Sequence, residues 1–138
     1  MAGWSAVGVT RGLLAGCAVA TLGIGIHMAQ PWGDNYAYQG ARAYLQLAAM
    51  LLWAIAPYVA LALGARLFRT SGRARLACCI GAIVIGLAGV YAYVDTAFIH
   101  PDAQGGLSFI AVPVLQWIAV LGLWAACAAM HWLGRRTG

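Results

Sequence analysis

Four long apolar runs joined by short connections constrain the fold of this 138-residue sequence more than any other feature. The runs cover about residues 7–28, 41–63, 76–99 and 107–133. Because a helix rises about 1.5 Å per residue and the hydrocarbon core is about 30 Å thick, about 20 apolar residues cross a membrane. Short connections place consecutive helices side by side and antiparallel. The sequence therefore predicts an all-α membrane protein, an up-down bundle of four transmembrane helices, with residues 1–138 in a single integral membrane domain.

The composition excludes most soluble classes of protein. Hydrophobic residues make up 64% of the chain and charged residues only 8%, against about 25% in a typical soluble domain. The sequence has neither lysine nor glutamate, which removes Schiff-base lysines and glutamate general bases. We therefore expect a protein that is not an enzyme. We also expect no nucleic-acid binding, because membrane topology explains the net charge of +5 better.

The arginines are distributed unevenly between the two ends of the predicted helices. Arg42 lies at the end where the first and third apolar runs finish, and the three aspartates lie toward that end as well. The other seven arginines lie at the opposite end: Arg11, Arg66, Arg69, Arg73, Arg75, Arg135 and Arg136. Basic residues concentrate on the cytoplasmic side of multi-pass membrane proteins. The pattern predicts a bacterial inner-membrane protein with both termini in the cytoplasm.

The two halves of the chain resemble each other. Leu-Ala-Gly at 14–16 is followed, after nine residues, by Ile26-His27, and Leu-Ala-Gly at 87–89 is followed, after nine residues, by Ile99-His100. Each histidine is then followed by Pro, Asp and Gln-Gly in the same order. This pattern suggests a tandem duplication of a helical hairpin. Because each hairpin would start on the same side of the membrane, the two copies would be parallel, as in some transporters.

Several polar residues fall within or close to the apolar runs and need partners. Asp95 lies near the outer end of the third run, and Tyr91 is four residues earlier on the same helix face. We expect Asp95 to pair with Arg42 and to fasten the second helix to the third; the alternative is a transport pathway, since ionisable residues inside membranes are often functional. Gln116 falls near the middle of the fourth run, where its amide requires partners on other helices.

A second polar group is expected at the outer face. It consists of His27, His100, Asp102 and Asp34. Histidine and carboxylate side chains can bind a transition metal or haem, or they can simply be hydrated at the membrane surface. We expect no cofactor, with a metal or haem held by His27 and His100 as the alternative.

Small residues predict close helix packing. Gly12 and Gly16 in the first run, and Gly86 and Gly89 in the third, would allow close approach of helix backbones within the bundle or against a partner. The four cysteines lie in the apolar runs and carry no CxxC motif, so we expect them to pack as small apolar residues.

Three functions remain open on these grounds. The first is a non-catalytic accessory subunit of a membrane complex, or an immunity or inhibitor protein, acting through its helix faces and outer loops. The second is a small ion or solute transporter or channel that works as a parallel homodimer, since four helices leave little room for a pathway. The third is a histidine-based metal or haem protein. The expected partners are the lipid bilayer and another membrane protein or a second copy of the chain.

Overall fold

The computed structural model describes residues 5–31, 40–68, 72–101 and 105–136, and these are almost entirely helical. Four long helices follow one another: α1 (Ala6–Ala29), α2 (Ala41–Leu67), α3 (Gly72–Val94) and α4 (Ser108–Arg136). A short π-helix, η2 (Asp95–Ile99), continues α3, and a 3-10 turn, η3 (Gly105–Leu107), precedes α4. All four predicted helices are therefore present, and their bounds differ from the predicted ones by up to five residues.

Each of the four helices is long and apolar enough to cross a membrane. Only 17–33% of the residues in the four spanning windows are buried inside the bundle, so most of the side chains face outward. Large apolar side chains cover this outward surface, among them Val19, Leu45, Leu67, Leu115 and Ile118, each more than 60% exposed. Such a surface suits contact with lipid, where backbone polar groups are satisfied within the helices.

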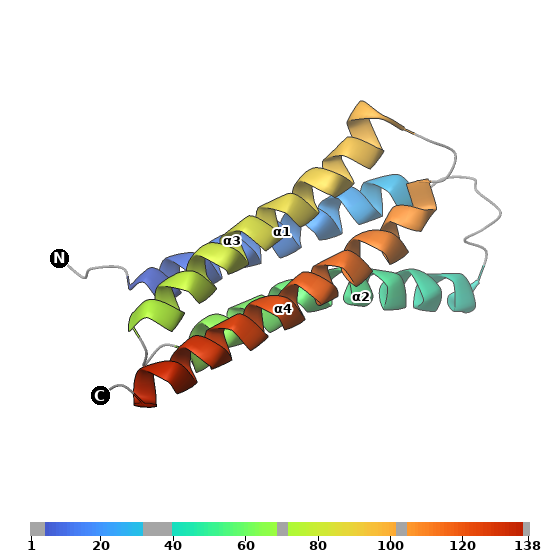
Figure 1. Ribbon diagram of the computed structural model, residues 1–138. Helices are drawn as coiled ribbons and strands as arrows, with labels where there is room; N and C mark the ends of the chain where they lie inside the picture. The colour runs from blue at the N-terminus through green and yellow to red at the C-terminus, as the bar shows by residue number, and fades with distance from the viewer. Residues whose placement is uncertain (1–4, 32–39, 69–71, 102–104, 137–138) are drawn as a thin grey trace.

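The helices form an up-down bundle. α1 packs against α2 and α3, and α4 packs against the same two helices from the other side. The start of α1 and the end of α4 lie at the same end of the bundle, together with the end of α2 and the start of α3 (Figure 1). Arg11, Arg66, Arg73 and Arg75 belong to this end, whereas Arg42 opens α2 at the other. The predicted up-down bundle of four helices is confirmed.

Local sequence explains where α1 begins and ends. Ser5 caps the helix, because its hydroxyl accepts a hydrogen bond of 3.2 Å from the backbone amide of Gly8. At the other end, Gln30 adopts a left-handed conformation (φ 42°) and its amide donates to the carbonyl of Ile26. Gly40 precedes α2 with a φ of 106°, a backbone conformation that residues other than glycine rarely adopt.

Glycines receive large side chains at each of the four helix interfaces. A β-carbon at Gly25 would collide with Leu51, one at Gly64 with Trp124, one at Gly81 with Leu123 and one at Gly86 with Leu14. These pairs join α1 to α2, α2 to α4, α3 to α4 and α1 to α3, respectively. Membrane helices associate largely through such close packing, because lipid provides no hydrophobic force between them. The glycines therefore allow close packing at these four interfaces.

The two halves of the proposed repeat do not share one environment. Leu14 is 1% exposed, whereas its counterpart Leu87 is 54% exposed. Gly16 has open space around it, whereas its counterpart Gly89 is covered by Gln116 and Tyr58. The similarity between the hairpins is thus a similarity of sequence, without equivalent packing at these positions.

Candidate functional site

A hydrogen-bonded polar group lies inside the bundle and takes one residue from each of three helices. Thr21 of α1 and Tyr58 of α2 share a buried hydrogen bond of 2.9 Å between their hydroxyls. Gln116 of α4 lies beside them, and its Nε2 makes a long, 3.5 Å contact with the carbonyl oxygen of Ile85 on α3. We call Thr21, Tyr58 and Gln116 the polar layer. It connects all four helices, since Ile85 supplies the contact to α3.

Gly89 creates the space that the polar layer occupies. A β-carbon at Gly89 would collide with the Nε2 of Gln116 and lie 2.8 Å from the hydroxyl of Tyr58. Among the described residues, the Oε1 of Gln116 and the nearby hydroxyl of Tyr93 are buried without a hydrogen-bond partner. The polar layer and the neighbouring Tyr93 therefore keep one unpaired polar atom each, which a bound molecule or water could satisfy.

Asp95 is placed differently from the prediction. Its Oδ1 lies 3.0 Å from the Nδ1 of His100, at the end of the same π-helical turn, and the two groups form a hydrogen bond, or an ion pair when the imidazole is protonated. The predicted ion pair with Arg42 is absent from the described part of the chain, so that prediction is wrong. The reason is local: the backbone amide of His100 donates to the carbonyl of Asp95 at 2.7 Å, which widens the turn and brings the imidazole back to the carboxylate. Tyr91 is 64% exposed on the surface of α3.

The predicted outer-face group is only partly described. His27 stacks on Phe98, with ring centroids 5.4 Å apart, and this contact joins α1 to the end of the third helix. His100 is 78% exposed beside Asp95. Asp34 and Asp102 lie outside the described residues. Within the described ranges, no group of three or more His, Cys, Asp or Glu side chains could hold a metal ion.

The predicted packing glycines fall into two classes. Gly86 and Gly89 are buried and receive side chains from neighbouring helices. Gly12 and Gly16 are exposed, and a β-carbon at either would have no atom within 4 Å. Gly23, further along α1, is equally open. With the exposed Ala20, these residues form a small-residue surface that we call the α1 outer face.

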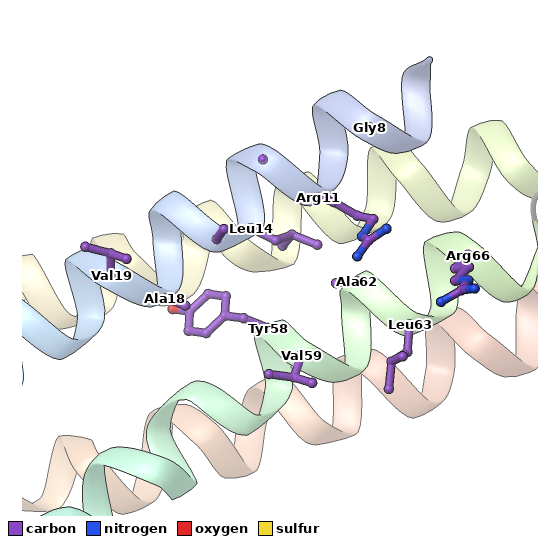
Figure 2. A pocket seen from close by; sticks show the side chains of 12 residues that line it. Gly8, Arg11, Leu14, Ala18, Val19, Tyr58, Val59, Ala62, Leu63 and Arg66 are labelled. Carbon is purple, nitrogen blue, oxygen red and sulfur yellow. The ribbon is translucent and has the colours of Figure 1, made fainter. Parts of the chain in front are cut away.

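A groove of about 710 Å³ runs between α1 and α2 (Figure 2). Arg11 and Arg66 extend from the two helices at one end of it, and the ring of Tyr58 lies between the helices further along. Small and aliphatic residues form the rest of the lining: Gly8, Gly12, Leu14, Ala15, Ala18, Val19, Val59, Ala62 and Leu63. We call this the α1–α2 groove.

Four candidate site residues were missed from the sequence: Thr21, Tyr58, Arg11 and Arg66. Thr21 and Tyr58 complete the polar layer, and Arg66 joins Arg11 at the groove. One signal was present: Tyr58 is a hydroxyl-bearing residue deep inside an apolar run, next to Pro57. A polar atom at such a position requires a hydrogen-bond partner, and this requirement alone points to a second polar residue on another helix.

Comparison with protein-family models, with curated proteins and with solved structures gave no match for this chain.

Proposed function

We propose that this membrane protein is a non-catalytic binding subunit that associates, through the α1 outer face, with a transmembrane helix of another membrane protein. It would serve as an accessory subunit of a complex or as an immunity or inhibitor protein. Small residues at a helix surface support this role because they let a second backbone approach closely. The two helices then associate through close van der Waals packing of their backbones, in place of contacts between large side chains.

One observation carries the proposal: Gly12, Gly16 and Gly23 leave open space on the side of α1 that faces away from the bundle. The buried side of the same helix holds Thr10, Leu14, Cys17, Thr21 and Ile24. At 3.6 residues per turn, positions 12, 16 and 23 point away from this buried side, and the exposed Ala20 lies at the border between the two sides. Glycines at the interfaces inside the bundle, such as Gly64, Gly81 and Gly86, receive a neighbour's side chain, and a cluster of open glycines on α1 leaves the same kind of space for a neighbour from outside the chain.

Photo-crosslinking in intact cells tests the proposal. A photoreactive residue at Ala20 should form a crosslink to one defined polypeptide. The matched control is Ala88, an exposed alanine on α3 whose neighbours Val84, Leu87 and Tyr91 are large and exposed. Equal crosslinking from Ala20 and Ala88, or crosslinking only to lipid, would remove the α1 outer face as the binding surface.

The arginine distribution supports a bacterial inner-membrane location with both termini in the cytoplasm. In the bundle, Arg11, Arg66, Arg73 and Arg75 belong to one end, and Asp95 and Arg42 to the other. Under the positive-inside rule, the end with more arginines faces the cytoplasm. The partner helix would therefore meet α1 within that membrane.

The polar layer favours transport as a second candidate function. The buried, unpartnered Oε1 of Gln116 is the kind of group that coordinates a solute or ion inside a membrane. A parallel homodimer formed through the α1 outer face would provide the larger enclosure that a pathway needs. This alternative predicts that Ala20 crosslinks to a second copy of the chain. It also predicts that proton or cation flux into liposomes is lost in Gln116→Leu, whereas a protein that shows no flux contradicts it.

A further inference from the structure

We propose that the α1–α2 groove binds one anionic phospholipid from the leaflet that contains Arg11 and Arg66. The phosphate lies between the two guanidinium groups, and one acyl chain extends along the groove toward Tyr58. This site adjoins the α1 outer face, with which it shares Gly12, but lipid binding does not depend on the proposed partner.

The charges at the mouth of the groove favour an anion from outside the chain. Neither Arg11 nor Arg66 forms an ion pair within the described residues. The chain has only three acidic residues, and Asp95 is at the other end of the bundle. The other two, Asp34 and Asp102, lie outside the described residues. Two cations on facing helices repel each other until an anion neutralises them, and guanidinium groups match phosphate oxygens in a bidentate manner.

The length of the groove fits a lipid of one leaflet. Arg11 to Val19 on α1, and Arg66 to Tyr58 on α2, each span eight residues, or about 12 Å along the helix. This is most of the roughly 15 Å that one leaflet contributes to a hydrocarbon core of about 30 Å. The arginines therefore lie at headgroup depth when the groove lies among the acyl chains. Basic pockets between transmembrane helices are known to bind anionic lipid headgroups.

The lining of the groove provides room for a chain. Ala15, Ala18 and Ala62 present only methyl groups to it, which leaves the volume of about 710 Å³. This volume lies within the roughly 300–1,000 Å³ of ligand pockets. The hydroxyl of Tyr58 is engaged by Thr21, so the groove meets the aromatic ring rather than a free polar group. An apolar tail with a phosphate head matches both parts of the site.

Native mass spectrometry of the full chain in detergent, with phosphatidylglycerol or phosphatidylcholine added, tests the proposal. We expect one phosphatidylglycerol to remain bound and phosphatidylcholine to bind much more weakly. The double variant Arg11→Gln/Arg66→Gln should lose about thirtyfold in phosphatidylglycerol affinity, the combined effect of two basic residues near the membrane surface. The control Arg73→Gln/Arg75→Gln removes the same charge from exposed positions on α3, outside the groove, and should bind as the wild type does.

A second pair of variants tests the acyl chain with all the charges in place. Ala15→Leu fills the groove and should weaken phosphatidylglycerol binding at least tenfold, whereas Ala88→Leu, on the exposed surface of α3, should not. Equal loss in the two arginine double variants, equal binding of the two lipids, or unchanged binding in Ala15→Leu would each overturn the proposal. Displacement of the lipid by inorganic phosphate at the same concentration would show an anion site without a lipid and would overturn it as well.

Discussion

Gly89 is the residue on which the polar layer depends most directly. Because Gly89 has no side chain, Gln116 and the hydroxyl of Tyr58 can lie directly against the backbone of α3. The hydrogen bond between Tyr58 and Thr21 is buried, and so is Gln116, which is 5% exposed. Polar groups inside a membrane are costly unless they are paired, so the position of these three side chains is closely determined.

Gly89→Ala should therefore destabilise the bundle. The added methyl group forces Gln116 or Tyr58 to move, and overpacking of this kind costs about 1–3 kcal/mol. Thermal unfolding in detergent measures the effect. The matched control is Gly122→Ala on α4, where a β-carbon meets nothing within 4 Å. The control should be neutral or slightly stabilising, since alanine favours helix over glycine by about 1 kcal/mol. Equal melting temperatures for the two variants would contradict the tight fit at Gly89.

Of the polar layer, only Gln116 was identified from the sequence, and the other two members, Thr21 and Tyr58, were not. Gln116 could be identified because an amide in an apolar run has to be satisfied. Its proximity to Tyr58 depends on how α2 and α4 are rotated about their axes, and the sequence does not determine this rotation when apolar residues surround each helix. The pairing of Asp95 failed for another reason. The prediction assumed a regular α-helix at Asp95. The structure has a π-helical turn there, which brings Asp95 and His100 together, and no motif in the sequence indicated that turn.

At the scale of elements, α1 combines two surfaces with different requirements. Its buried side contributes Thr21 and Leu14 to the bundle, and its opposite side carries the open glycines. The existence and approximate bounds of all four helices followed from the apolar runs and helix length. The sequence did not indicate which glycines of α1 and α3 pack inside the bundle, because small residues occur on several faces of both helices.

The η2 turn should behave as a local element whose loss leaves the bundle intact. In Asp95→Ala, the contact with the imidazole of His100 disappears. Because His100 is 78% exposed and Asp95 35% exposed, the pair contributes only about 0–1 kcal/mol. We expect faster hydrogen exchange at the His100 amide with little change in melting temperature. A large fall in melting temperature would show that Asp95 fastens the helices to one another, as the sequence had predicted.

At the scale of the whole molecule, the four helices present apolar side chains on most of their surface and basic residues mainly at one end. This arrangement supports a bilayer-spanning protein with that end in the cytoplasm. The α1 outer face and the α1–α2 groove then lie on the lipid-exposed surface, where a partner helix and a lipid can reach them without opening the bundle.

The topology can be tested with single added cysteines. The native cysteines, Cys17, Cys78, Cys79 and Cys127, are all buried, so the wild type should remain unlabelled by a membrane-impermeant maleimide. In intact spheroplasts, Ala41→Cys should be labelled and Ala6→Cys should not, because they lie at opposite ends of the bundle. Both should react after permeabilisation. Labelling of Ala6→Cys before permeabilisation would place the arginine-rich end outside.

The central claim is that the α1 outer face binds another membrane protein. Its most direct test is native mass spectrometry of the protein extracted gently from its own membrane, as the wild type and as Gly16→Leu/Ala20→Leu, with Ala88→Leu as the control. We predict a stoichiometric second polypeptide on the wild type and on Ala88→Leu, and its loss from the double variant, because two leucines would hold the partner's backbone away from α1. A wild-type protein that carries only lipid, or a partner that the double variant retains, would contradict the claim.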